Sequence, residues 1–184
     1  MMEMANKKEI GDEGMRNIRR SEKLLVLGLS IILIFMIIQD WVPLGSLNDV
    51  QAIHQAKSSS ELITTTLIGV VQFLLLLGLV LIFIGKRYPI WARLWLVIHQ
   101  LSIFIGVLFS WYLPYFLGYK AEEKVEEYRE MFGDTHSFLP EMNGIVPNTF
   151  HVVFHLTLLF SIVLSIYISL TNNKESSKIY KKAS

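Results

Sequence analysis

Residues 73–85 read FLLLLGLVLIFIG, and this run decides the fold class of the chain. The apolar stretch around it extends over residues 62–85, and its few polar side chains are Thr64, Thr65, Thr66 and Gln72. A helix needs about 20 apolar residues to cross a bilayer, so this stretch can span one with some tilt. The 184-residue chain is 52% hydrophobic and 18% charged, a composition typical of an integral membrane protein rather than a soluble domain.

Three further stretches have the length and apolar character of a membrane span. They cover residues 24–42, 90–116 and 149–170. The short KRYP segment at 86–89 predicts a tight turn, whereas longer outer loops cover 43–61 and 117–148. Within the second loop, the helix-forming residues 120–131 predict a short surface helix. The sequence therefore predicts an all-α membrane protein, a four-transmembrane-helix bundle over residues 24–170.

Basic residues predict how the bundle is oriented. Of the 17 Lys and Arg residues, the two long loops hold only four, so the other 13 lie in the tails 1–23 and 171–184 and at the turn region 86–93. Lys and Arg in short loops and tails stay on the cytoplasmic side. We therefore expect both termini to be cytoplasmic and the protein to be a multi-pass protein of the cytoplasmic (cell) membrane. Cleavage of the first span as a signal peptide is disfavoured, because no A-x-A-like site follows Trp41.

Several kinds of chemistry are excluded or weakly supported by the residues present. The chain contains no cysteine, which removes disulfides, thiolate nucleophiles and cysteine-based metal sites. Asp and Glu are absent from the deep positions of the spans, and apart from Pro114 the spans are uninterrupted, so transport by the chain alone has little support. Nucleotide-binding loops, Ser-His-Asp elements and nucleic-acid motifs are also absent, and we expect no nucleic-acid partner.

Polar and small side chains in membrane helices turn toward other helices. In the 90–116 span the expected inward stripe is His99, Ser102, Gly106 and Ser110. The corresponding stripes are Glu61, Thr65, Gly69, Gln72 and Leu76 in the 62–85 span, and His151, His155, Ile162 and Ser169 in the 149–170 span. A rise of about 1.5 Å per residue places Gln72 and His99 near the midplane, where we expect them to share a hydrogen bond, with Thr65 nearer the outer end.

His151 and His155 form an H-x-x-x-H pair, which puts two imidazoles on one helix face at a spacing suited to one metal ion. Asn148 is a suitable N-cap just before them, and the helix dipole there disfavours the imidazolium form. Further ligands could come from Asp40, Glu61, His54 or His136. Zinc suits such a mixed set of nitrogen and oxygen ligands. The competing interpretation is a pair of buried histidines bonded to Thr and backbone, since no H-E-x-x-H glutamate separates them.

The sequence supports two functions. The leading hypothesis is a non-transporting accessory, sensor or ligand-binding protein, with an outward-facing polar pocket between the last three spans and the 117–148 loop as its lid. Its partners would be the lipid bilayer and either another membrane protein or a lipid-like ligand. The alternative is a metal-dependent membrane enzyme acting at the outer leaflet through His151 and His155, with a carboxylate such as Glu61 as ligand or general base.

Overall fold

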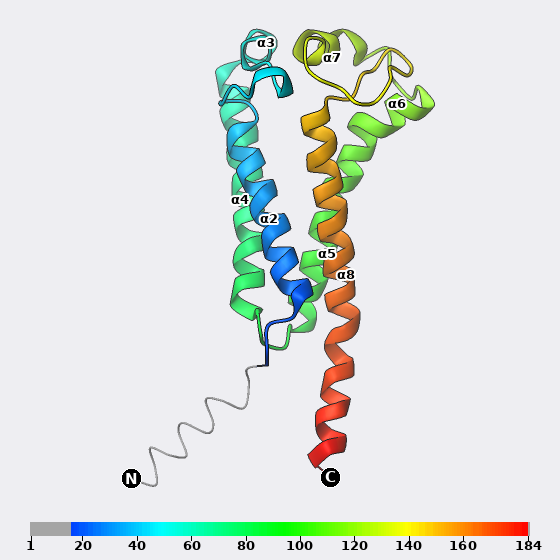
Figure 1. The fold of residues 1–184 in the computed structure, drawn as a ribbon. Coiled ribbons are helices and arrows are strands. Elements are labelled where there is room, and N and C mark those ends of the chain that lie inside the picture. Colours follow the sequence, from blue (N-terminus) through cyan, green and yellow to red (C-terminus); the bar gives the residue numbers. More distant parts are fainter. Residues whose placement is uncertain (1–15, 184) are drawn as a thin grey trace.

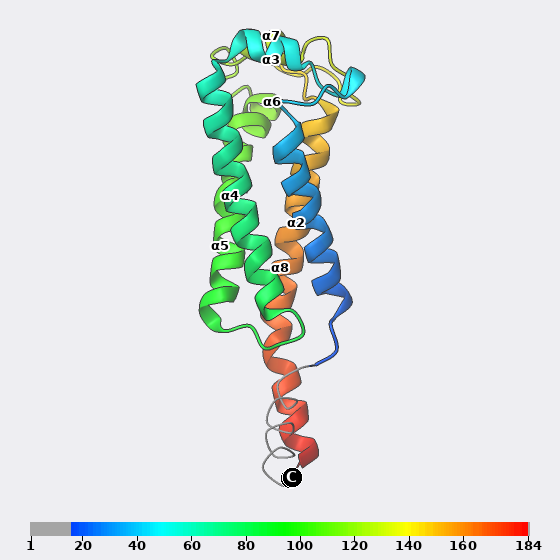
Figure 2. The same ribbon diagram turned by 90° about the vertical axis from the view of Figure 1, so that its left-hand side faces the viewer.

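The protein is an all-α bundle in which four long helices run side by side (Figures 1 and 2). The computed structural model describes residues 16–183, with side chains to residue 171. The long helices are α2 (Arg20–Ile38), α4 (Ser59–Phe83), α5 (Ile90–Val107) and α8 (Thr149–Ala183). A π-helical turn, η2 (Leu108–Tyr112), and α6 (Leu113–Leu117) continue α5. This continuous segment and the other three helices are each long and apolar enough to cross a membrane, which confirms the four predicted spans.

The helix ends follow local chemistry. α4 begins three residues before the predicted 62–85 span because Ser58 caps it, accepting a hydrogen bond from the backbone N–H of Glu61 at 3.3 Å. After α4 ends, the chain turns at Gly85, whose φ of +71° is a conformation that glycine adopts without strain. α8 continues well beyond the predicted 149–170 span to Ala183. Residues 1–15 of the predicted N-terminal tail lie outside the described residues.

Two short helices cover one end of the bundle, and we call them the cap. They are α3 (Val50–Ala56) and α7 (Val125–Phe132), which pack against each other across the top of Figure 1. α7 corresponds to the predicted surface helix at 120–131, whereas the sequence analysis did not predict α3. Asp49 caps α3 by accepting a hydrogen bond from the backbone N–H of Ala52 at 2.9 Å. α2 begins and α8 ends at the opposite, uncapped end of the bundle.

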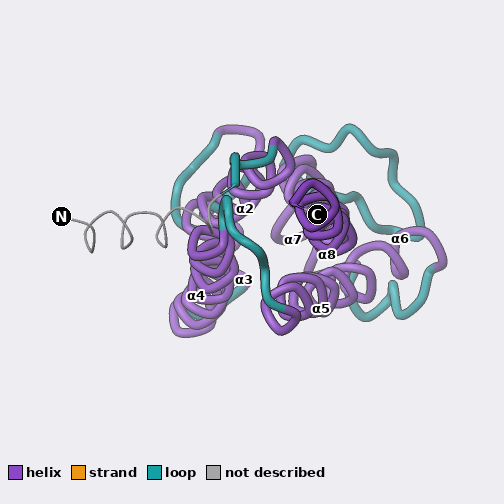
Figure 3. The backbone as a smooth tube through the Cα atoms, turned by 90° about the horizontal axis from the view of Figure 1, so that it is seen from below, coloured by secondary structure: helices purple, strands orange, loops and turns teal. Residues whose placement is uncertain are grey.

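The bundle core lies along α2 and α8. α2 packs against both α4 and α8, and α5 packs against α8, as the view along the bundle shows (Figure 3). α4 and α5 contact each other only slightly although one turn joins them. α2 and α8 approach closely at Gly28, where an added Cβ would lie 2.6 Å from the Oγ of Ser161.

The predicted inward stripe of the 90–116 span is found only in part, because His99 and Ser110 are half-buried but its two middle members are not. Ser102 and Gly106 are exposed, and no atom lies within 4 Å of a Cβ built on Gly106. Gln100 faces the core instead, fully buried, and its Nε2 donates to the Oγ of Ser165 at 2.8 Å. His99, one residue before it, stacks on Trp95 with ring centroids 5.2 Å apart. Among the described residues no hydrogen bond joins His99 to Gln72, in contrast to the prediction.

The inward stripe that the sequence predicts for α8 agrees with the structure. His155 and Ile162 are buried and His151 and Ser169 are half-buried, so this face does turn inward. On α4 the predicted stripe is divided. Gly69 and Leu76 are buried, Gln72 is half-buried, and Glu61 and Thr65 are exposed.

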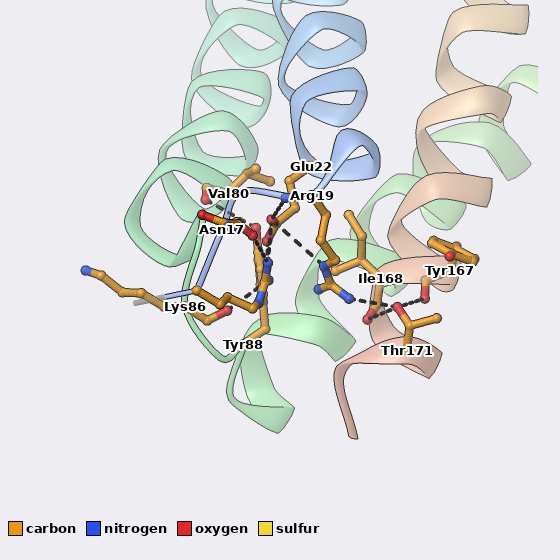
Figure 4. Close-up of polar contacts among 10 residues, drawn as sticks. Asn17, Arg19, Glu22, Val80, Lys86, Tyr88, Tyr167, Ile168 and Thr171 are labelled. Carbon is orange, nitrogen blue, oxygen red and sulfur yellow. Dashed lines mark hydrogen bonds and ion pairs between the residues drawn. The ribbon is translucent and has the colours of Figure 1, made fainter. Parts of the chain in front are cut away.

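The uncapped end is closed by an ionic cluster around Glu22, drawn in Figure 4. Glu22 is fully buried and accepts two hydrogen bonds from the Arg16 guanidinium, at 2.8 and 2.5 Å. The Arg16 guanidinium also donates to the backbone oxygen of Lys86 in the α4–α5 turn. Arg19 lies 3.9 Å from the Glu22 carboxylate and donates to the Oγ1 of Thr171 on α8 at 2.9 Å. One carboxylate thus links the start of α2, the α4–α5 turn and α8.

Candidate functional site

A cavity of about 240 Å³ lies beneath the cap, and we call it the chamber. Three of the four candidate spans, the segment that follows α2 and both cap helices contribute to its wall, which mixes polar and apolar side chains. Its lining residues are Gln39, Asp40, Ile53, Lys57, Leu62, Thr65, Ser110, Trp111, Tyr128, Met131, Phe132 and His151. The predicted polar pocket between the later spans therefore has a counterpart here, with residues 39–40 after α2 as an additional part of the wall and α3 as an additional part of the lid.

A proline in α6 explains how α7 is held over the chamber. In a regular helix the carbonyl of Ser110 would accept a hydrogen bond from residue 114, but Pro114 has no N–H to donate. The hydroxyl of Tyr128 on α7 donates to this carbonyl instead, at 2.7 Å. Burial raises the pKa of Tyr128, so its hydroxyl keeps the proton that it donates. The defect in the helix thus supplies the attachment point of the cap.

Two buried asparagines secure the loops around the chamber. Asn48 donates to the carbonyls of Gln39 and Val42, at 2.8 and 2.9 Å. Asn148 donates to the carbonyl of Leu47 at 2.9 Å, and its Oδ1 accepts from the backbone N–H of His151 at 3.2 Å, as expected of the predicted N-cap. These bonds join the segment after α2 to the segment before α8, so the chamber rim does not depend on the cap helices alone.

The chamber contains one acidic and one basic side chain. Asp40 is 9% exposed, and its carboxylate has one side-chain hydrogen bond among the described residues, a long one of 3.4 Å from Gln39. Burial raises the pKa of this carboxyl, while the positive charges of Lys57 and His54 act in the opposite direction. The ammonium of Lys57 lies 3.6 Å from the carboxylate of Glu127 on α7. Among the described residues, Asp40 is therefore a buried acid with no cation at salt-bridge distance.

Aromatic rings enclose His151 on three sides. Trp111 stacks on it with ring centroids 5.1 Å apart, and the rings of Phe132 and Phe35 lie edge-on at 5.0 and 5.5 Å. The Nδ1 atom of His151 is buried without a hydrogen-bond partner among the described residues. Leaving such a group unpaired costs free energy, so a ligand that bonds to it would bind more favourably.

The predicted metal ligands are only partly brought together. His151 and His155 lie one turn apart with ring centroids separated by 6.3 Å, and Asp40 lines the same chamber as His151. Glu61 instead bonds to its own N-cap, Ser58, and is exposed. In the part of the chain that the structure describes, no three His, Asp or Glu side chains gather into a group that could hold a metal ion.

The other candidate ligands are occupied elsewhere in the cap. His54 donates from Nε2 to the backbone carbonyl of Asp40 at 2.9 Å, and His136 shares a hydrogen bond with Thr149 at 2.9 Å. Zinc binding by His151 and His155 stays a prediction. Of three polar residues that the sequence predicts to face inward, Thr65 lines the chamber, whereas His99 and Gln72 do not belong to its wall.

Comparison of the chain with protein-family models, with curated proteins and with solved structures finds no match in any of the three.

Proposed function

We propose that this chain is a non-transporting ligand-binding protein of the cytoplasmic membrane, serving as an accessory or sensor protein. Its ligand binds in the chamber, which faces outward. The observation that carries the proposal is the chamber itself, a cavity of about 240 Å³ in which Asp40 and His151 hold buried, poorly satisfied polar atoms. Cavities with a few convergent polar groups are the usual sites of small ligands.

The basic residues support the outward orientation of the chamber. They concentrate in the two tails and in the turn at the uncapped end, and such residues stay on the cytoplasmic side. The cap and the chamber would then face the opposite side. The ionic cluster around Glu22 closes the cytoplasmic end, which supports binding rather than passage through the bundle.

The charges in the chamber indicate the class of ligand. Lys57 suits an anionic group, and Asp40 and the face of Trp111 suit a cationic one. A small polar molecule or headgroup carrying both charges complements this lining best. A sensor of this kind would transmit binding through the cap, because α3, α7 and the spans all contribute to the same wall.

The test is to fill the chamber and measure what the purified protein retains. Thr65→Phe places a ring in the chamber wall, and Thr64→Phe is the matched control because Thr64 is exposed and lies outside that wall. Small molecules released from each purified protein are then quantified by mass spectrometry. We expect a polar molecule that is retained by the wild type and the control and lost from Thr65→Phe. Equal retention by all three proteins contradicts the proposal.

The metal-dependent enzyme is kept as a second candidate because one observation favours it. The Nδ1 atoms of His151 and His155 are both buried and without hydrogen-bond partners among the described residues. Elemental analysis of protein purified without chelator or histidine tag decides between the candidates. The enzyme is favoured if the wild type holds about one equivalent of zinc and the double variant His151→Ala/His155→Ala loses it. If the wild type holds less than about a tenth of an equivalent, only the binding-protein proposal stands.

A further inference from the structure

A second cavity, separate from the chamber, lies between the α5–α6 segment and α8. We call it the lateral groove. It has a volume of about 480 Å³ and a lining that is almost entirely apolar. Its lining residues are Phe104, Leu108, Tyr112, Leu113, Phe116, Leu117, His155, Leu156 and Leu159. The groove lies within segments long and apolar enough to cross a membrane, so its opening faces hydrocarbon rather than water.

The π-helical turn η2 and Pro114 account for the groove. A π turn and a proline both disturb the regular helix, and they stand where α5 passes into α6. Figure 1 shows α6 diverging from α8 toward the capped end. The groove is therefore a built feature of the backbone and does not depend on the rotamer of one side chain.

His155 is the buried polar side chain in this apolar wall. It is 3% exposed, and its Nδ1 atom has no hydrogen-bond partner among the described residues. The rings of Trp111, Tyr112 and Phe154 surround it, with centroids 5.8, 5.5 and 5.3 Å away. No hydrogen bond of the imidazole is found among the described residues, so a polar group that enters the groove can supply one.

The depth of His155 indicates which part of a lipid would meet it. His155 follows Thr149, the first residue of α8, by six positions, which places it about 9 Å below the start of the helix. In a hydrocarbon core about 30 Å thick, this is the outer third, the part of the core nearest the ester groups of that leaflet. An ester carbonyl is a hydrogen-bond acceptor and carries no charge, which suits a groove without charged residues.

We propose that the lateral groove binds one acyl chain of a glycerolipid from the leaflet at the capped end, with the ester carbonyl accepting a hydrogen bond from the imidazole of His155. The volume of the groove falls within the range of about 300–1,000 Å³ that small-molecule sites occupy. This proposal does not depend on the ligand of the chamber. His155 lines the groove and contacts Trp111, which lines the chamber, so a bound chain also supports the chamber wall.

Trp111 provides a reporter for the test. It contacts His155, whereas Trp41, Trp91 and Trp95 are exposed at other positions and can be replaced by Phe. The protein with Trp111 alone is reconstituted into phosphatidylcholine vesicles in which a rising fraction of the lipid carries brominated acyl chains, which quench tryptophan fluorescence at short range. We expect quenching that rises linearly with the brominated fraction, as for a single site.

Two double variants control for lipid that merely surrounds the bundle. Leu108→Phe/Leu159→Phe fills the groove, and Ile105→Phe/Val163→Phe adds the same rings at exposed positions on the same helices. We expect the first pair to abolish most of the quenching and the second to leave it unchanged. Absent quenching, or quenching that both variants retain equally, overturns the proposal.

The hydrogen bond is tested in the protein with Trp111 alone and without groove-filling substitutions, which we call the unfilled protein. Misfolding of a variant then does not affect the result. Unbrominated diester and diether phosphatidylcholines compete with the brominated lipid, and only the diester has a carbonyl. One hydrogen bond predicts a preference of about three- to tenfold for the diester. The variant His155→Phe should lose this preference. Equal competition by the two lipids in the unfilled protein overturns the assignment of an ester-linked chain to the groove.

Discussion

The two ends of the bundle both bury an acidic side chain, but they treat it differently. At the uncapped end the Glu22 carboxylate accepts two hydrogen bonds from Arg16 and one from the backbone N–H of Arg19. At the capped end Asp40, which is nearly as buried, has only the long hydrogen bond from Gln39 among the described side chains. Buried charges are normally paired, so the unpaired one needs a different explanation.

This difference separates a structural role from a binding role. The Glu22 cluster uses its pairing to fasten three segments together, and little of the carboxylate's bonding capacity remains for a ligand. The capped end leaves Asp40, His151 and His155 with unused capacity beside cavities. A protein that binds a ligand at one end gains from a rigid opposite end, since the free energy of binding is then not lost in loosening the bundle.

The largest expected effect is on cysteine labelling, which tests whether the two ends face opposite sides of the membrane. Because the chain has no cysteine, single cysteines can be labelled against a silent background. We expect Ser59→Cys and Asp134→Cys at the capped end to react with an impermeant reagent in sealed cells, and Lys8→Cys, Arg87→Cys and Lys178→Cys to remain unlabelled. Labelling of Arg87→Cys from outside would reject the proposed orientation.

Removing the charge of Glu22 at the uncapped end should lower the free energy of unfolding. Glu22→Gln leaves Arg16 and Arg19 without their carboxylate, and breaking a buried pair in this way costs about 3 kcal/mol, the lower end of the usual range because Arg16 is partly exposed. Reversible unfolding in mixed micelles measures the loss. Glu61→Gln, an exposed change at the capped end, is the control and should fall within about 0.5 kcal/mol of the wild type.

Close packing of α2 against α8 joins the two ends of the bundle. Gly28→Val places a side chain against Ser161 where α2 meets α8, and overpacking of this kind costs about 1–3 kcal/mol. Gly106→Leu is the control, since nothing lies within 4 Å of its Cβ position. The sequence predicts instead that Gly106 faces another helix. A loss of stability in Gly106→Leu would therefore support the predicted stripe and contradict the exposed position of Gly106.

The smallest expected effect is a change in melting temperature that arises from Asp40 and depends on pH. Because burial raises the pKa of Asp40 above its ordinary value of 3.8, the folded protein holds this proton more tightly than the unfolded chain does. The stability of the wild type should therefore fall as pH rises from about 4 through the raised pKa. Asp40→Asn lacks this loss, so its melting temperature should exceed that of the wild type at pH 7 and match it at acidic pH. A difference that is independent of pH would show that the charge does not matter.

The spans were predictable because their signal is the length of each apolar stretch, which bilayer thickness sets. The rotation of a span was not equally predictable. Lipid-facing residues are as apolar as core residues, so a few polar side chains must define the inward face. On α8 the two histidines did so correctly. On α5, His99 and Gln100 are adjacent and about 100° apart, and the sequence analysis selected the wrong one.

The candidate site was predictable only as a location. The polar side chains near the outer end indicated a pocket under the 117–148 loop, and His151 and Thr65 do line the chamber. The rim of the chamber depends on the bond from Asn148 to the carbonyl of Leu47, two residues that are far apart in the chain, and local patterns do not encode it. The attachment of Tyr128 to Ser110 likewise needs the fold, because only in the fold does α7 reach the carbonyl that Pro114 leaves free.

The π turn η2 also has a consequence for how the chain tolerates changes in length. A π turn holds one residue more than the α-helical turn it replaces, so it corresponds to a one-residue insertion in an otherwise regular helix. Deleting the exposed Phe109 would return the segment to an α-helix while the residues on either side keep their faces. A single insertion or deletion at this turn can thus change how α6 leaves α8, while Pro114 and the four-helix bundle beneath it stay in place.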